Sequence, residues 1–214
     1  HRISRDVKPQ HAAFAEPLSC ALHAVERAQI KFEDTVVIAG AGPIGLSALI
    51  GARQKNPLRI ITLDMDDAKL ELARRCGADL TINIAEEDAV ARIKELTDGY
   101  GADVYIECTG HPSAVPQGLN LLRKLGTYVE YSVFGSDVTV DWSIISDDKE
   151  LNVYGAHLGP FTWGAAVKII EEGELPLDDI CTHQYPLDRF QEALDMVGDS
   201  RGASIKVSIL PQSK

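Results

Sequence analysis

The sequence of 214 residues contains a glycine-rich run, Gly40-Ala41-Gly42-Pro43-Ile44-Gly45, inside its longest uncharged stretch, residues 35–52. A stretch of this length is nearly long enough to cross a bilayer as one helix. The glycines and the proline at its centre would break such a helix, because glycine is flexible and proline lacks the amide hydrogen. The run therefore favours a buried strand, a tight turn and a buried helix, in that order.

Short β-branched runs alternate with helix-period segments along the rest of the chain. We expect strands at residues 35–39, 59–63, 80–84, 103–107, 126–133 and 151–154, and helices at 66–76, at 85–96 and from Pro112 to before Gly126. Such alternation implies parallel βαβ units with right-handed crossovers. The sequence thus predicts an α/β fold with a doubly wound six-stranded parallel sheet, a Rossmann fold.

The composition excludes some classes of partner. Thirty-two acidic and 21 basic residues give a formal charge of −11, which disfavours nucleic acid and anionic membrane surfaces as partners. The four cysteines, Cys20, Cys76, Cys108 and Cys181, are far apart and form no CxxC pair, and the first residues show no secretory signal. We expect reduced thiols and a cytoplasmic location.

The glycine run gains meaning from its surroundings. It follows the first expected strand and opens a helix, and the acidic residue Asp64 closes the next strand, as in the dinucleotide-binding fingerprint. Gly40 permits the tight turn, Gly42 lets a pyrophosphate approach, and Gly45 lets the helix pack on the strand. Asp64 would accept hydrogen bonds from a ribose, and residues 65–67 contain no arginine for a 2′-phosphate, so NAD is expected rather than NADP. The alternatives are an ordinary turn and a helix-capping acid.

Several chemistries are excluded because their motifs are absent. No tyrosine is followed four positions later by lysine, the proton-donating pair of short-chain dehydrogenases. The phosphate-binding loop G-x-x-x-x-G-K-[ST], the zinc protease motif H-E-x-x-H and the hydrolase elbow G-x-S-x-G are also absent.

Longer segments carry a family resemblance. The segment 13–24 (AFAEPLSCALHA), the turn 40–45, Asp64 with Lys69, and the motifs 76–79 (CGAD), 101–104 (GADV), 107–110 (ECTG) and 205–207 resemble the zinc-dependent medium-chain dehydrogenases. The polyol branch around sorbitol and threonine dehydrogenases is the most similar. The resemblance covers the whole chain, which looks like the C-terminal three-fifths of such an enzyme, without the catalytic domain that precedes it in the family.

The resemblance implies three parts. Residues 1–29 would be the connecting helix from the missing catalytic domain, residues 30–175 the NAD-binding Rossmann domain, and residues 176–214 a segment that returns to the catalytic domain. The first and last parts would be remnants of a flanking GroES-like domain. The site residues that the resemblance implies are Gly40, Gly42, Pro43, Ile44 and Gly45 at the pyrophosphate, Asp64 and Lys69 at the adenosine ribose, Thr109, Gly110, Val133 and Phe134 at the nicotinamide, and Ala156 and Leu158 at its carboxamide. Lys69 as a solvated cation, and the strand-end residues as packing, remain alternatives.

One residue is a candidate for contact with a metal. The resemblance implies that Glu16 lies in the first or second coordination shell of zinc in the intact enzyme, although Glu16 before Pro17 is also a sensible helix start. Cys20 and His23 share a helix face with Glu16, but Glu16 and His23 are about 10 Å apart along a helix axis, too far for one ion. We expect Cys20 and His23 to be buried packing residues and the fragment to bind no zinc by itself.

The expected function is therefore part of a zinc-type enzyme. The intact protein would transfer hydride from a polyol or another secondary alcohol to NAD, and the fragment alone would be inactive. A zinc-free quinone reductase of the same superfamily and a nonenzymatic NAD-sensing module remain alternatives. We expect a homo-oligomer, dimer or tetramer, with residues 151–154 or 138–140 as the pairing edge strand.

Overall fold

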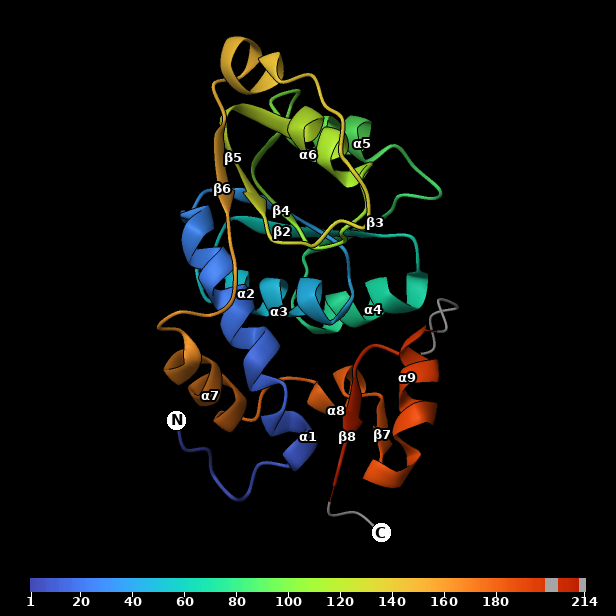
Figure 1. Ribbon diagram of the computed structural model, residues 1–214. Helices are drawn as coiled ribbons and strands as arrows, with labels where there is room; N and C mark the ends of the chain where they lie inside the picture. The colour runs from blue at the N-terminus through green and yellow to red at the C-terminus, as the bar shows by residue number, and fades with distance from the viewer. Residues whose placement is uncertain (199–203, 212–214) are drawn as a thin grey trace.

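The computed structural model describes residues 1–198 and 204–211. A six-stranded sheet of order β3-β2-β1-β4-β5-β6 forms its centre (Figure 1), and all neighbouring strands in it are parallel. The strands are β1 (Thr35–Ala39), β2 (Arg59–Asp64), β3 (Leu80–Asn83), β4 (Ala102–Glu107), β5 (Leu122–Glu130) and β6 (Asn152–Gly155). The predicted doubly wound parallel sheet is confirmed.

Helices cover both faces of this sheet. Figure 1 shows α2 (Ala15–Ala28), α3 (Pro43–Arg53) and α4 (Asp67–Arg75) on one face, and α5 (Ala89–Leu96) and α6 (Ala114–Leu121) on the other. Helix α7 (Trp163–Glu171) packs on α2, outside the sheet. The strand order reverses beside β1, so the carboxyl ends of β1, β2 and β4 border the crevice where such sheets bind ligands.

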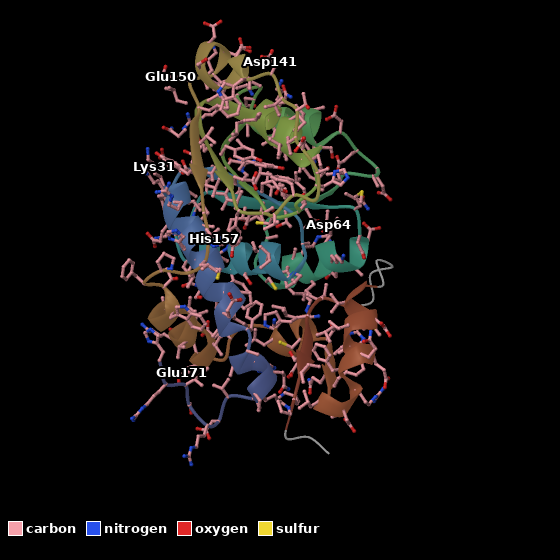
Figure 2. All side chains as sticks on the ribbon, in the orientation of Figure 1. Lys31, Asp64, Asp141, Glu150, His157 and Glu171 are labelled. Carbon is pink, nitrogen blue, oxygen red and sulfur yellow. The ribbon has the colours of Figure 1, made fainter. Side chains whose placement is uncertain are left out.

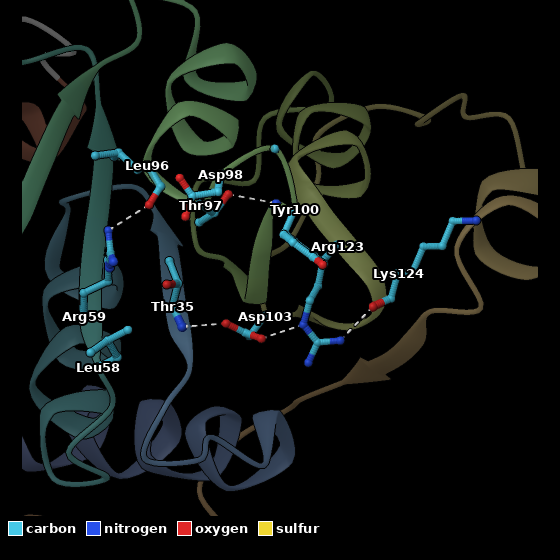
Figure 3. Close-up of a pocket in the computed structure, with 12 residues that line it drawn as sticks. Thr35, Leu58, Arg59, Leu96, Thr97, Asp98, Tyr100, Asp103, Arg123 and Lys124 are labelled. Atoms are coloured by element: carbon cyan, nitrogen blue, oxygen red, sulfur yellow. Dashed lines mark hydrogen bonds and ion pairs between the residues drawn. The ribbon is translucent and has the colours of Figure 1, made fainter.

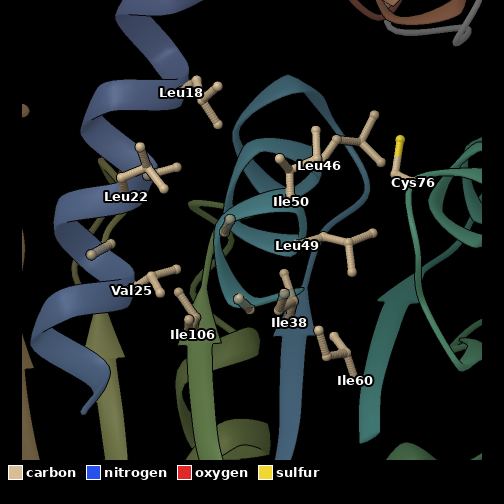
Figure 4. Close-up of a cluster of buried hydrophobic side chains, with 14 of the residues drawn as sticks. Leu18, Leu22, Val25, Ile38, Leu46, Leu49, Ile50, Ile60, Cys76 and Ile106 are labelled. Carbon is tan, nitrogen blue, oxygen red and sulfur yellow. The ribbon is translucent and has the colours of Figure 1, made fainter. Parts of the chain in front are cut away.

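The core consists of two apolar clusters, one on each face. Along β1, Val36 and Ile38 face one cluster, and Val37 and Ala39 face the other. In the first cluster the α3 side chains Leu46, Leu49 and Ile50 meet β1 and β2, and α2 packs beside them (Figure 4). Burial of one such leucine or isoleucine is worth about 1.5–3 kcal/mol. All five residues of β1 are buried, which explains its continuous apolar sequence.

Aspartates fix the start of two helices. The Asp66 carboxylate accepts hydrogen bonds from the amides of Ala68 and Lys69 at the start of α4. Asp88 does the same for Val90 and Ala91 at the start of α5. The expected helix 85–96 therefore begins later than predicted, at Ala89, because the residues before the cap form a turn.

The largest error in the predicted boundaries concerns β5. This strand runs from Leu122 to Glu130 rather than over 126–133, and α6 ends at Leu121, well before Gly126. The β4–β5 register shifts between Ala102 and Val104, and Leu125 has a positive φ of 61°, so an irregularity interrupts the strand. Residues 138–140 form no strand, so that candidate edge is wrong, whereas β6 does lie at the sheet edge.

The last described residues form a separate small unit beyond α4. Strands β7 (His183–Tyr185) and β8 (Val207–Ile209) pair in parallel. An ion pair between Arg75 and Asp179 links the unit to α4. The remaining elements are α1 (Pro9–Ala12), η1 (Ile144–Asp148), α8 (Leu177–Ile180), η2 (Leu187–Arg189) and α9 (Phe190–Gly198). Among the described residues, no helix combines the length and apolar character needed to cross a membrane.

Candidate functional site

The glycine turn joins β1 to α3 at the carboxyl edge of the sheet. Gly42 is the N-cap of α3 and Pro43 is its first residue, and no side chain caps this end. A Cβ atom on Gly45 would overlap the carbonyl oxygen of Gly40, so only glycine fits there. A Cβ atom on Gly42 would meet no atom within 4 Å. The turn is therefore closed on the protein side at Gly45 and open at Gly42, where the amides of the helix start face outward.

Asp64 ends β2 beside this turn. Its Oδ2 accepts a hydrogen bond of 2.7 Å from the amide of Ala41, and its Oδ1 accepts bonds from the amides of Met65 (2.8 Å) and Asp66 (3.1 Å). These three donors hold the carboxylate at one place. The prediction that Asp64 closes the second strand is confirmed.

A cavity of about 310 Å³ lies between the ends of β1, β2 and β4. Its wall includes Gly40, Asp64, Met65, Thr109, His111 and Gln117. Met65 is 69% exposed, and His111 and Gln117 come from the loop after β4 and from α6. The amide of Ser113 donates to Nδ1 of His111 over 3.3 Å, so Nδ1 acts as an acceptor.

Sequence reasoning missed Met65, His111 and Gln117 as wall residues. The available signal was their position just after an expected strand, or in the helix that follows it, because those segments border the carboxyl edge of a parallel sheet.

A second cavity of about 260 Å³ adjoins the first, since Thr109 lines both. The second cavity is also lined by Ile44, Cys108, Gly110, Tyr131 and Val133. The expected end of the fourth strand at Glu107 is confirmed, whereas the fifth strand ends three residues before the expected Val133. The strands end at Glu107 and Glu130, and Thr109, Gly110, Val133 and Phe134 lie in the turns that follow.

Glu107 holds the turn after β4. This side chain is fully buried, and its carboxylate accepts bonds from the amide of Thr109 (2.7 Å), the hydroxyl of Thr109 (2.5 Å) and the amide of Gly110 (3.2 Å). Three donors offset the cost of burying the charge.

Glu130 holds the turn after β5. Its Oε1 accepts a bond of 2.9 Å from the amide of Ser132, and its Oε2 accepts one of 3.2 Å from the hydroxyl of Tyr128. Burial raises the pKa of Glu130 to about 7, and the nearby Glu107 carboxylate adds to the rise. The titratable groups that face Glu130 are Tyr105 and Glu107 from β4, Cys108 just after β4, and Tyr128 from its own strand, and none of these is a cation. Its partner on β6 is Gly155.

Seven other expected residues are not among those that line the two cavities. This group consists of Gly42, Pro43, Gly45, Lys69, Phe134, Ala156 and Leu158. The amide of Ala156 donates to the carbonyl oxygen of Glu130 over 2.9 Å, so the chain after β6 passes beside the end of β5. Leu158 is 58% exposed and has a positive φ of 55°. Lys69 lies in the first turn of α4, where its amide meets Asp66.

Glu16 lies in the first turn of α2, and its side chain is exposed. The Cys20 thiol donates to Oε1 of Glu16 over 3.2 Å. Burial, with help from this carboxylate, raises the pKa of Cys20 to about 11, so the thiol is neutral at physiological pH. Cys20 is buried as expected, whereas His23 is only half-buried. In the part of the chain that the structure describes, no three histidine, cysteine, aspartate or glutamate side chains form a group that could hold a metal.

A larger cavity, about 860 Å³, lies at the opposite edge, at the amino ends of the strands. Figure 3 shows several of its polar groups paired: Asp103 accepts from the amide of Thr35 and from Arg123, and Arg59 donates to the carbonyl oxygen of Leu96. Ligands of parallel sheets bind at the carboxyl ends of the strands. We therefore place the candidate site at the smaller pair of cavities.

Comparisons with known proteins identify the family to which the chain is similar. Residues 43–172 match the family of zinc-binding dehydrogenases. The chain is 71% identical over 211 residues to the erythritol/L-threitol dehydrogenase of Mycolicibacterium smegmatis, covering 99% of this chain and 58% of that protein. It is 35% identical over 214 residues to the sorbitol dehydrogenase of Halalkalibacterium halodurans, covering 99% and 62%.

A solved structure is also similar. A zinc-binding dehydrogenase of Sinorhizobium meliloti 1021 bound to NADP matches with a TM-score of 0.89 and 31% identity, over 99% of this chain and 62% of that one. The chain thus spans about three-fifths of the length of these relatives.

Proposed function

This chain belongs to the zinc-binding dehydrogenase family, and we propose that it supplies the dinucleotide-binding part of an NAD-dependent enzyme that oxidises a polyol or another secondary alcohol. One observation carries the proposal. The open glycine turn and the Asp64 carboxylate lie together at the carboxyl edge of the sheet, joined by the hydrogen bond from the Ala41 amide. A dinucleotide needs both features, one for its pyrophosphate and one for its ribose.

The domain division forms part of the proposal. Residues 30–175 would bind the cofactor. Residues 1–29 and 176–214 would belong with a further domain, for which the longer relatives have enough additional residues. The small β7–β8 sheet supports this division, because it shares no strand with the six-stranded sheet.

The pyrophosphate would bind at the start of α3. The helix dipole and the outward amides after Gly42 favour a negative group there, and the open space at Gly42 lets it come close. Pro43 and Ile44 shape this end of the helix, and Gly45 keeps the helix against the turn.

Asp64 would select the nucleotide. Its carboxylate can accept hydrogen bonds from the ribose hydroxyls and repels a 2′-phosphate. Lys69 remains the candidate second contact to the ribose. The relative from Sinorhizobium meliloti was solved with NADP, so the preference of this chain for NAD depends on Asp64 and needs its own test.

The nicotinamide would lie at the second cavity. Thr109, Gly110, Val133 and Phe134 would orient the ring, and the backbone at Ala156 and Leu158 would meet its carboxamide. When bound, the nicotinamide accepts a hydride from the alcohol carbon. The protein groups around it fix the position of the ring and keep water away.

The described residues do not fit a complete zinc site. Glu16 is a single candidate contact, and zinc needs at least three protein ligands in enzymes of this kind of chemistry. We therefore keep Glu16 as a proposed metal contact in a longer protein and derive no step through the metal from this chain.

The names of two relatives, an erythritol/L-threitol dehydrogenase and a sorbitol dehydrogenase, support a proposal for the substrate class. We propose a small polyol for the intact enzyme and a homo-oligomer that pairs through the exposed edge strand β6. The four free cysteines support a reducing compartment such as the cytoplasm.

Calorimetric titration with NAD and NADP tests the cofactor proposal. We expect the wild-type chain to bind NAD at least about tenfold more tightly, a difference of about 1.4 kcal/mol. Asp64→Ala removes both the acceptor and the charge, and Asp64→Asn removes only the charge, so both variants should lose the preference. Asp98→Ala, at the opposite edge, is the control and should change neither affinity. Equal or tighter binding of NADP by the wild-type chain contradicts the proposal.

A further inference from the structure

Two glutamates stand side by side behind the second cavity. Glu107 and Glu130 end neighbouring strands and are paired in the β4–β5 register. Both side chains lie on the α5–α6 face of the sheet, two residues after Tyr105 and Tyr128, which pack in that cluster. The residues before them in both strands are apolar and buried. Two adjacent carboxylates in such a place cost free energy, because like charges repel and burial removes water.

Each of the two glutamates holds the turn that follows its own strand, and both turns form the wall of the second cavity. Glu107 holds the amides of the 109–110 turn, and Glu130 holds the amide of Ser132. A further bond ties the second turn to the end of β4, since the Ser132 hydroxyl donates to the carbonyl oxygen of Glu107 over 3.2 Å. The Glu130 carboxylate, by holding the Ser132 amide, thus helps to keep Ser132 against the end of β4.

The turns also touch each other at the cavity. A Cβ atom on Gly110 would lie 2.7 Å from the carbonyl oxygen of Val133, and Gly110 has a φ of +69°. The Val133 side chain is 92% exposed, so it is held at the surface by its backbone and not by packing. The position of Val133 therefore depends on the hydrogen bonds of the turn that carries it.

We propose that Glu130 is a positioning residue for the nicotinamide half of the cofactor, which it serves by holding the 131–134 turn against the 109–110 turn before the cofactor arrives. The inference rests on the proposed function, because a dinucleotide is the ligand that would bring a nicotinamide to this cavity. Glu130 touches neither the adenosine side nor the glycine turn. A substitution of Glu130 should therefore weaken the binding of the nicotinamide half of the dinucleotide and leave the binding of the adenosine half unchanged.

The test compares NAD with ADP-ribose, which has the adenosine, the pyrophosphate and the second ribose but no nicotinamide. Both are titrated calorimetrically into the 214-residue chain and its variants. Glu130→Met keeps the length of the side chain and removes the acceptor, and it relieves a buried charge, so it should fold. Glu130→Gln keeps an acceptor for the Ser132 amide and is the conservative rescue. Glu33→Gln, exposed in the turn before β1, is the control.

We expect the wild-type chain to bind NAD more tightly than ADP-ribose. Glu130→Met should weaken NAD about fivefold, as for the loss of one hydrogen bond of about 1 kcal/mol, and should leave ADP-ribose within about twofold. Glu130→Gln and Glu33→Gln should keep the wild-type difference between the two ligands.

Two outcomes overturn the inference while leaving the proposed function intact. One is equal wild-type affinity for NAD and ADP-ribose, and the other is a Glu130→Met variant that weakens both ligands alike or neither. Failure of the wild-type chain to bind either ligand would instead overturn the proposed function.

Discussion

Gly42 and Gly45 have different roles in the glycine turn. Gly45 faces the Gly40 carbonyl, and Gly42 faces open space. Gly45→Ala should therefore force the turn apart, lower the free energy of unfolding by about 1–3 kcal/mol and weaken NAD binding. Gly42→Ala should leave the unfolding free energy within about 0.5 kcal/mol of wild type and still weaken NAD. Urea unfolding and calorimetry on the two variants check this pair.

Only Gly45→Ala should lower the free energy of unfolding, whereas both variants should weaken NAD binding. If Gly42→Ala binds NAD as well as the wild-type chain does, the open side of the turn does not face the ligand.

The buried charge of Glu130 should make stability depend on pH. Its pKa rises from an ordinary 4.5 to about 7 in the folded chain, so the folded state holds a proton that the unfolded state has lost. The stabilisation from this proton is complete below about pH 4.5 and disappears as the pH rises through about 7. Glu130→Gln carries no charge at any pH. The melting temperature of Glu130→Gln minus that of the wild type should therefore increase from pH 5.5 to pH 8.5.

Differential scanning fluorimetry at several pH values gives this difference, and Glu33→Gln is the control with a constant difference. A difference for Glu130→Gln that does not change with pH would show that the carboxylate is solvated and titrates normally.

Some site residues could be predicted from sequence and others could not. The turn 40–45 and Asp64 lie within one βαβ unit, so their spacing is enough to bring them together. Glu107 and Glu130 come together only through the register of β4 with β5, and His111 enters the cavity wall through the path of the loop after β4. These positions depend on strand pairing, which a local pattern does not encode.

At the scale of elements, short polar caps decide where helices begin. Asp88 accepts two amide hydrogen bonds at the start of α5, far from the glycine turn in sequence. Asp88→Ala should lower the free energy of unfolding by about 1 kcal/mol, and Asp88→Asn should retain most of the cap. NAD affinity should stay unchanged in both variants. Chemical denaturation checks the prediction, and an Asp88→Ala variant as stable as wild type would contradict the capping role.

Strand boundaries were less predictable than strand existence. The sequence places all six strands of the central sheet, and most plainly β1, β2 and β4, because these largely buried parallel strands are rich in apolar residues. The start of β5 was missed because Arg123 and Lys124 make its first residues look like a helix end or a loop. The bulge near Leu125 lets this polar segment join the sheet. No local sequence pattern predicts this bulge.

At the scale of the whole molecule, the two edges of the sheet have different chemistry. The carboxyl edge carries the open turn, Asp64, the buried Glu107 and the half-buried Glu130, and the amino edge carries the larger cavity with the Asp103–Arg123 ion pair. Labelled acidic residues such as Asp141, Glu150 and Glu171 lie on the exposed periphery (Figure 2), in keeping with the net charge of −11. A negatively charged dinucleotide must bind against this overall charge, so the helix start and its amides have to supply the attraction.

The most direct test of the account is a crystal structure of this chain with NAD. We predict electron density for the pyrophosphate at the start of α3, for the adenosine ribose within hydrogen-bond distance of Asp64, and for the nicotinamide beside Thr109 and Val133. A nucleotide bound instead in the 860 Å³ cavity near Asp103 and Arg123 would contradict the account.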